Sequence, residues 1–253
     1  SIALCELSES NPSAVLSELV NDDGSMMRGG QITEFAKEHG LEIISIDELA
    51  RVLPVKANVE VAKMQWADLP LENAEWQIST YISPTGAEHA ILKFADSPKS
   101  QPLVRVHSEC LTGDVLGSKR CDCGPQLQEA IRLIEENGHG YVIYIRDHEG
   151  RGIGLAEKIR AYVLQDSGQD TVQANVSIGQ PIDDRTYEDA AEILHRLKIT
   201  SLTLLTNNPE KISAIRKAGI EVTTAPLEVI ANKHNQKYLE TKRDKLNHAL
   251  GAL

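Results

Sequence analysis

Three of the four cysteines in this chain fall within fourteen residues, as Cys110 and then the close pair Cys121 and Cys123. The residues around them are largely polar, charged or glycine, a composition typical of a metal site and not of an apolar core. Any fold of this chain therefore has to bring a distant thiol up to a close pair of thiols.

The spacing of these cysteines favours a catalytic zinc site. Zinc prefers four tetrahedral ligands, and structural sites usually take all four from protein. Three thiolates leave one position open, where zinc lowers the pKa of a bound water from ~15.7 to roughly 7. Two alternatives stay open: a closed structural site with His107 or His148 as fourth ligand, and free structural thiols.

The bulk composition excludes several classes of protein. The 253 residues are 41% hydrophobic and 25% charged, as in ordinary globular proteins. No apolar run approaches the ~20 residues of a membrane span, and we find no signal segment, so we expect a cytoplasmic protein without a membrane partner. The net charge of −11 argues against nucleic acid as a partner, because nucleic-acid binding needs clustered cations. Basic residues that gather between 105 and 160 indicate a small polyanion such as a nucleotide, or else a solvated helix face.

The pattern of apolar residues divides the chain near Leu53 and Pro54. Residues 1–53 predict a small, incomplete α/β segment with too little core to be stable alone. Its expected elements are a first helix, a loop at 21–24, a helix at 33–39, a strand at 41–46 and a helix from Asp47.

Residues 54–253 predict one α/β (α+β) domain, a mixed sheet with flanking helices, because strands alternate with helices. The expected strands are 76–82 and 90–94, joined by a turn at 83–86, then 141–146 and 201–206. The expected helices are 125–137, one ending near Asp166, one starting near Thr186, and 210–217.

Three loops in this domain hold candidate ligand-binding residues. The glycines of EGRGIG at 149–154 allow close approach to a phosphate, and Arg151 adds a planar fork, although a plain tight turn is the alternative. Thr206 and Lys211 could reach a phosphate or a base edge, or their loop could only cap a helix. Asp183 and Arg185 could be a general base and a phosphate clamp, or an N-cap and a surface pair.

Taken in order, the motifs resemble GTP cyclohydrolase II over about residues 60–250. The matching stretches are RVHSECLTGD at 105–114, SKRCDCG at 118–124, EGRGIGL at 149–155, KIRAY at 158–162, LTNNP at 205–209 and YLETK at 238–242. Several linked motifs in one order are far more specific than any one alone. The chain departs from the family at His148, where many relatives have glutamine, and near Ala225, where an arginine is missing.

The resemblance implies hydrolysis of GTP to formate, pyrophosphate and 2,5-diamino-6-ribosylamino-4(3H)-pyrimidinone 5′-phosphate, the first step of riboflavin biosynthesis. It also implies one zinc ion per chain at Cys110, Cys121 and Cys123, together with magnesium and a homodimer. The residues that match the family's GTP contacts are Arg105, Val106, His107, Ser108, Glu109, Gln126, Glu149, Gly150, Arg151, Thr171, Thr206 and Lys211.

The resemblance implies three catalytic residues as well. Asp183 matches a proton acceptor, Arg185 a nucleophile on the α-phosphate, and Tyr162 a tyrosine that takes part in catalysis. A guanidinium keeps its proton to pH above ~12, so a charge clamp is an equally acceptable role for Arg185.

The first ~50 residues resemble the C-terminal end of 3,4-dihydroxy-2-butanone 4-phosphate synthase, an activity often fused to GTP cyclohydrolase II. The matching stretches are 12–26 and 34–40, and Glu18 matches a catalytic glutamate. The acidic metal-binding loop and metal-binding histidine of that family precede this point and are absent. We therefore expect no synthase activity.

Two other functions stay open. The chain could be a non-catalytic nucleotide-binding relative that keeps a structural zinc, although the presence of Asp183, Arg185 and Tyr162 argues against it. It could also be a related hydrolase of purine nucleotides that stops at a formylated intermediate. Competition by ATP against GTP would distinguish such an enzyme from a GTP cyclohydrolase II.

Overall fold

The computed structural model describes residues 2–46, 48–49, 64–96, 101–227 and 229–246. The chain divides into two compact units, Ser1–Ala62 and Lys63–Leu253. The boundary predicted at Leu53 and Pro54 lies outside the described residues and stays a prediction. None of the helices in the described part of the chain has the length and apolar run needed to cross a membrane.

The first unit has little regular structure. It contains α1 (Ile2–Leu7) and α2 (Gly30–His39), which ends at Gly40 in the left-handed conformation. A tight turn brings Val20 opposite Met26, as expected for the loop at 21–24. The strand predicted at 41–46 is wrong: these residues pair with no strand among the described residues. A strand needs a partner for its N–H and C=O groups, which local apolar patterning does not supply. The helix predicted from Asp47 falls mostly outside the described residues.

The second unit is built on a mixed sheet of seven strands in the order β1-β2-β3-β5-β4-β6-β7. From β1 to β5 in this order the neighbours are antiparallel, and from β5 to β7 they are parallel. This sheet confirms the predicted fold class. The strands are β1 (Ala67–Pro70), β2 (Glu75–Ile82), β3 (Glu88–Ala95), β4 (Leu103–Ser108), β5 (His139–Ile145), β6 (Ser201–Leu205) and β7 (Glu221–Ala225).

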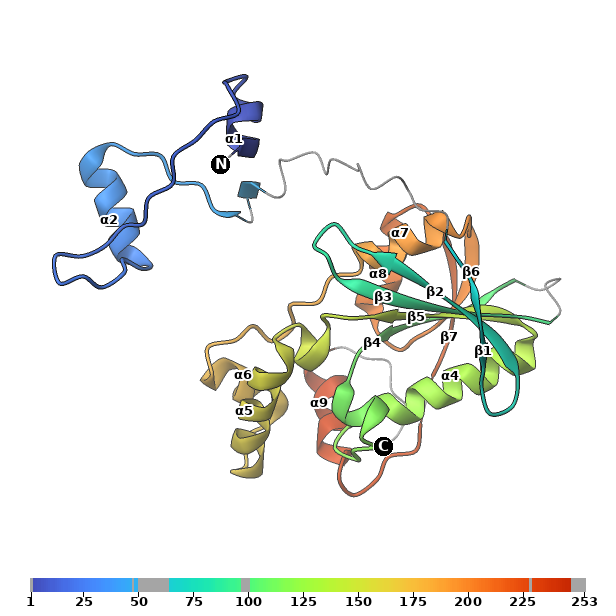
Figure 1. The fold of residues 1–253 in the computed structure, drawn as a ribbon. Helices are drawn as coiled ribbons and strands as arrows, with labels where there is room; N and C mark the ends of the chain where they lie inside the picture. Colours follow the sequence, from blue (N-terminus) through green and yellow to red (C-terminus); the bar gives the residue numbers. More distant parts are fainter. Residues whose placement is uncertain (1, 47, 50–63, 97–100, 228, 247–253) are drawn as a thin grey trace. The chain divides into compact units, whose positions relative to one another are not determined.

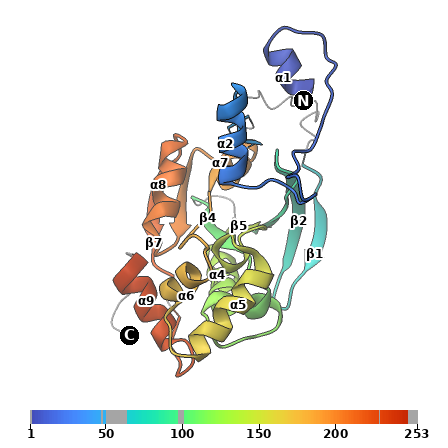
Figure 2. The same ribbon diagram turned by 90° about the vertical axis from the view of Figure 1, so that its left-hand side faces the viewer.

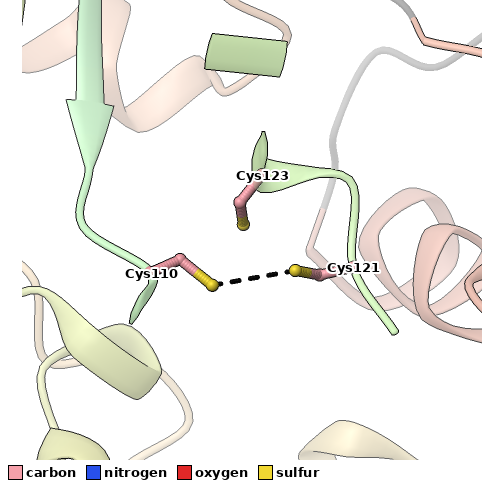
Figure 3. A group of neighbouring side chains, drawn as sticks. All are labelled: Cys110, Cys121 and Cys123. Atoms are coloured by element: carbon pink, nitrogen blue, oxygen red, sulfur yellow. Dashed lines mark hydrogen bonds between the residues drawn. The ribbon is translucent and has the colours of Figure 1, made fainter. Parts of the chain in front are cut away.

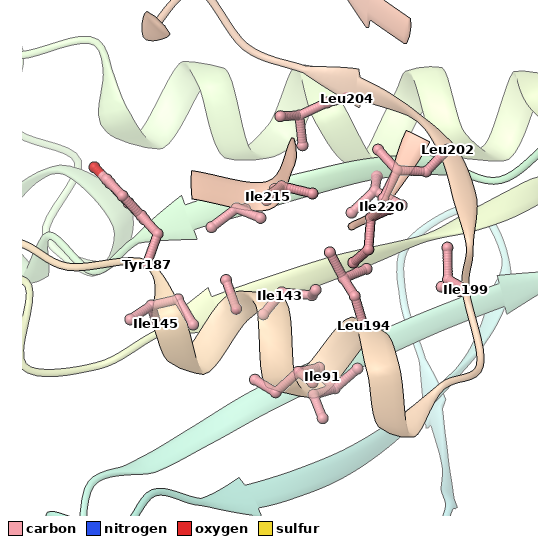
Figure 4. Packing of buried hydrophobic residues seen from close by; sticks show 14 of the residues in the cluster. Ile91, Ile143, Ile145, Tyr187, Leu194, Ile199, Leu202, Leu204, Ile215 and Ile220 are labelled. Carbon is pink, nitrogen blue, oxygen red and sulfur yellow. The ribbon is translucent and has the colours of Figure 1, made fainter. Parts of the chain in front are cut away.

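Helices pack on both faces of this sheet (Figures 1 and 2). One face carries a core of sheet residues such as Val104 and Ile143 packed against α7 and α8; Figure 4 shows Leu194 of α7 among them. The other face packs Val142 and Leu205 against α4. The helices are α4 (Cys123–Asn137), α5 (Gly154–Asp166), α6 (Thr171–Ser177), α7 (Glu188–Arg196), α8 (Pro209–Lys217) and α9 (Gln236–Leu246).

Local signals in the sequence explain where several elements end. Gly138 ends α4 in the left-handed conformation (φ 77°), as its position predicted. Asn208 caps α8 by accepting a hydrogen bond from the backbone N–H of Glu210, and Pro209 fills the first turn. The capping alternative for this loop is therefore correct for Asn208, and the hydroxyl of Thr206 supports the same turn by accepting from the backbone N–H of Asn208.

Candidate active site

The candidate site lies at the carboxyl ends of the parallel strands β4, β5 and β6. The end of β4 and the segments that follow the three strands contribute residues 108–110, 148–151 and 206–208 to one pocket. Ligands of open α/β sheets bind in this position. Side chains alternate along a strand, and Val104 and Val106 of β4 pack toward α7 and α8. Arg105 and His107 therefore project to the face of α4, where α5, α6 and α9 also gather (Figures 1 and 2).

The cysteines form a compact cluster. Their Sγ atoms lie within 4.8 Å of one another, and those of Cys110 and Cys121 are 3.7 Å apart (Figure 3). Cys110 follows β4, and the close pair lies at the beginning of α4. Glycine is required beside them, because a Cβ at Gly113 would lie 2.8 Å from the sulfur of Cys121. The donor set and its spacing fit a zinc ion bound by three thiolates.

Neither histidine considered as a fourth ligand joins this cluster. Among the described residues, the group of possible ligand atoms contains the three sulfurs alone. Nε2 of His107 lies 3.1 Å from both carboxylate oxygens of Asp114, and Nδ1 of His148 lies 3.0 Å from the hydroxyl of Ser108. The arrangement therefore favours a site with an open position over a closed structural site.

Lys158 of α5 lies directly against the cluster. Its Nζ is 3.2 Å from the sulfur of Cys110 and 2.5 Å from a carboxylate oxygen of Glu149. Hydrogen bonds from Cys121 and Cys123, aided by the charge of Lys158, hold the pKa of Cys110 below its usual range. A thiolate at Cys110 is thus favoured before any metal binds.

Three buried cations in the pocket have no carboxylate in an ion pair among the described residues: Arg105, Arg151 and Lys211. Both terminal nitrogens of Arg151 and Nε of Arg105 are buried without a described hydrogen-bond partner. Burial, with the charges of Arg105 and Arg185, lowers the pKa of Lys211, whose Nζ donates to the carbonyl of Val106. A buried cation without an anion is unfavourable, so the pocket is suited to an anionic ligand.

Asp183 and Arg185 form a bidentate ion pair beside the pocket. Nε of Arg185 donates to Asp183 at 2.8 Å, and Nη2 donates to its other oxygen. Burial alone would lower the pKa of Arg185, but the hydrogen bond and charge of Asp183 raise it above its ordinary value. The surface-pair alternative is wrong, because both side chains are largely buried.

Tyr162 and Thr171 reach the pocket from the two neighbouring helices. The hydroxyl of Tyr162 is 3.3 Å from that of Thr112, next to the cysteine cluster, and Arg120 lies 4.7 Å over its ring. Burial raises the pKa of Tyr162, so the hydroxyl keeps its proton. Thr171 begins α6, directly after the capping residue Asp170.

The pocket brings together most of the residues predicted from the sequence. Val106 and Asp183 are the two that do not line it. The side chain of Val106 lies in the core, and Asp183 lines a neighbouring cavity and acts on the pocket through Arg185. The predicted residues that line the pocket are Cys110, Cys121, Cys123, Arg105, His107, Ser108, Glu109, Gln126, Glu149, Gly150, Arg151, Tyr162, Thr171, Arg185, Thr206 and Lys211.

Several lining residues were not among the predicted site residues, notably Lys158, Tyr238 and Lys242. Lys242 of α9 pairs with the buried carboxylate of Asp122 at 2.6 Å, between two of the cysteines in sequence. A sequence signal for them existed: Lys158 precedes Tyr162 by four residues, and Tyr238 precedes Lys242 by four. Residues spaced this way share one helix face.

Comparison with known proteins agrees with this site. The family model for GTP cyclohydrolase II matches residues 62–226, and that for 3,4-dihydroxy-2-butanone 4-phosphate synthase matches residues 1–52. The chain belongs to the GTP cyclohydrolase II family. It carries an N-terminal segment from the synthase family, which confirms both resemblances.

The curated relatives of this GTP cyclohydrolase II family member are longer proteins. The riboflavin biosynthesis protein RibBA of Salinispora tropica is 45% identical over 251 residues, which cover 98% of this chain and 62% of that protein. RibBA of Aquifex aeolicus is 44% identical over 251 residues, with the same coverage of 98% and 62%. The chain therefore spans about three-fifths of the length of these relatives.

Proposed function

We propose that this chain hydrolyses GTP to formate, pyrophosphate and 2,5-diamino-6-ribosylamino-4(3H)-pyrimidinone 5′-phosphate in riboflavin biosynthesis, with zinc and magnesium as cofactors. The observation that carries the proposal is one pocket with two kinds of chemistry. A cluster of three thiols lines it together with three buried cations, which have no carboxylate partner among the described residues. Ring opening and loss of pyrophosphate require these two kinds of chemistry together.

The cations would bind the triphosphate. The two terminal nitrogens of Arg151, which have no hydrogen-bond partner among the described residues, form a planar fork that fits two oxygens of one phosphate. Arg105 adds a second buried charge, and an anion would offset the burial that lowers the pKa of Lys211 and so favour its charged form. Mg²⁺ would accompany the triphosphate, since it usually binds through substrate phosphates.

Cys110, Cys121 and Cys123 would hold the zinc. When bound, the metal supplies a Lewis acid and an acidified water for attack on the imidazole ring of guanine. The protonated hydroxyl of Tyr162, which lies beside Thr112, is available as a proton donor close to the metal ligands.

The geometry supports a charge clamp as the role of Arg185. The bidentate pair with Asp183 holds the guanidinium in its charged form, and a charged guanidinium is a poor nucleophile. Nη1 of Arg185 also reaches the hydroxyl of Ser108 at 3.5 Å, at the rim of the pocket. A fixed positive charge in this position would stabilise negative charge that develops on the departing phosphate.

We also propose a homodimer and a cytoplasmic location, which rest on the family resemblance. Sedimentation velocity of the purified chain tests the first proposal, and a monomer at micromolar concentration would refute it. Fractionation of cells that produce the protein tests the second.

The proposed reaction is tested by incubating zinc-loaded protein with GTP and Mg²⁺ while formate, pyrophosphate and the pyrimidine are assayed together. All three products are expected in equal amounts. Pyrophosphate without formate would indicate a hydrolase that stops at a formylated intermediate. GTP binding without any product would indicate a non-catalytic relative. ATP in excess should not slow product formation if the pocket selects guanine.

A further inference from the structure

Lys158 contacts the cysteine cluster in a way that sets it apart from the other cations of the pocket. Its side chain is buried, and its Nζ has three acceptors: the sulfur of Cys110 at 3.2 Å, the hydroxyl of Thr112 at 2.9 Å and a carboxylate oxygen of Glu149 at 2.5 Å. An ammonium has three N–H donors. All of them are used within the protein, so Lys158 has no donor left for a substrate, in contrast to Arg151.

Glu149 fixes this arrangement from the other side. One carboxylate oxygen accepts from the backbone N–H of Leu111 at 2.6 Å, directly after Cys110, and the other accepts from Lys158. The second oxygen also lies 3.1 Å from the backbone N–H of Gly150. Three donors of the protein thus share the two oxygens of Glu149, although the residue lines the pocket.

The charges explain why a cation is placed here. Three thiolates around a divalent ion carry a net charge of −1, and two of the three cysteines, Cys110 and Cys121, are buried. A buried net charge is unfavourable unless an opposite charge pairs with it. An ammonium that donates to the sulfur of Cys110 supplies that charge and withdraws electron density from the thiolate. Hydrogen bonds to metal-bound sulfur tune a site in this way.

We propose that Lys158 is a positioning residue for the metal centre, the charge partner of the Cys110 thiolate, held in place by Glu149, and not a contact to substrate. The inference rests on the metal role proposed above for the three cysteines. It assigns Glu149 to the support of the Cys110 loop, where the family resemblance suggested a contact with GTP.

The test replaces zinc by Co²⁺, whose thiolate-to-metal charge-transfer absorption reports on the sulfur ligands. Lys158→Met should move this band to longer wavelength, because a sulfur without its ammonium partner gives up electrons more easily. Zinc affinity, measured by competition with a chelator, should fall about 10–100-fold, the usual effect of removing a partner of a metal ligand. Lys158→Arg, which keeps the charge, should reverse part of the band shift and recover part of the zinc affinity.

Two further variants control this experiment. Arg160→Met removes an exposed cation from the same helix, where it pairs with Glu157, and should change neither the band nor the affinity. Lys158→Met leaves the carboxylate of Glu149 buried without its partner, so the double variant with Glu149→Gln guards against misfolding.

The outcomes separate this inference from the function it rests on. If the unaltered protein binds no Co²⁺ or zinc, the metal role of the cysteines fails. If it binds Co²⁺ but Lys158→Met leaves the band and the affinity unchanged, only the role of Lys158 fails. A loss of GTP affinity with an unchanged band would make Lys158 a substrate contact and overturn the inference.

Discussion

Replacing Arg151 by methionine should weaken the binding of GTP without weakening the fold. Both terminal nitrogens of this guanidinium are buried without a described hydrogen-bond partner, and the residue is only 8% exposed. In the ligand-free protein they therefore contribute no hydrogen bond to stability. Methionine fills similar space and has the same backbone preferences, so it meets the same strain at this left-handed position (φ 67°).

The size of the effect on binding follows from these two nitrogens. A hydrogen bond to a charged group contributes ~1.5–3 kcal/mol, so two of them to a phosphate contribute at most ~3–6 kcal/mol. We expect the Kd for GTP to rise about 100-fold, equivalent to about 2.7 kcal/mol. The melting temperature of the ligand-free protein should stay unchanged or rise, because a buried unpaired charge is removed.

The assay is calorimetric titration of metal-free protein with α,β-methylene-GTP, together with a melting curve without ligand. Arg132→Met is the matched control, because it removes an exposed arginine that pairs with Glu129 on α4, away from the pocket. Arg132→Met should change neither the Kd for the analogue nor the melting temperature by much. The reasoning is refuted if Arg151→Met keeps full affinity and lowers the melting temperature, since the guanidinium would then be a structural group.

Three further predictions concern other parts of the pocket. Cys123→Ser should abolish formate release and lower the zinc content, because an oxygen ligand binds zinc less well than a thiolate; formate release at the full rate would contradict a catalytic metal. Lys242→Met should destabilise the fold by about 3–5 kcal/mol by leaving Asp122 buried and unpaired, and urea unfolding should show partial recovery when Asp122→Asn is added. Burial, with the charges of Arg185 and Lys211, lowers the pKa of His148 to about 3. As the pH falls, the unfolded state binds this proton before the folded state does, so the free energy of unfolding should fall below pH ~6.5 and fall less in His148→Gln. Urea unfolding at pH 5 and 7 measures this, and an equal loss of unfolding free energy in both proteins would exclude the linkage.

The sequence alone was sufficient for the fold class and for most of the predicted residues that the structure brings into one pocket. Apolar periodicity predicts strands and helices, and residues such as Gly138 and Pro209 mark the end of one helix and the beginning of another. These effects are local. The cysteine spacing and the order of the motifs identified the family, because each motif depends on neighbours in the chain. The strand predicted at 41–46 was wrong for the same reason: apolar residues in a row do not specify a partner strand.

The partners of the charged groups were decided only by the tertiary structure. The parallel pairing of β4 with β5 and β6 brings three loops to one edge of the sheet, and this edge is where the separate motifs meet. The packing of α5 against this edge directs Lys158 to Cys110, 48 residues away in the chain. The packing of α9 likewise directs Lys242 to Asp122, 120 residues away. Local periodicity determines which face of a helix a side chain occupies, but the group it meets there depends on how distant elements pack.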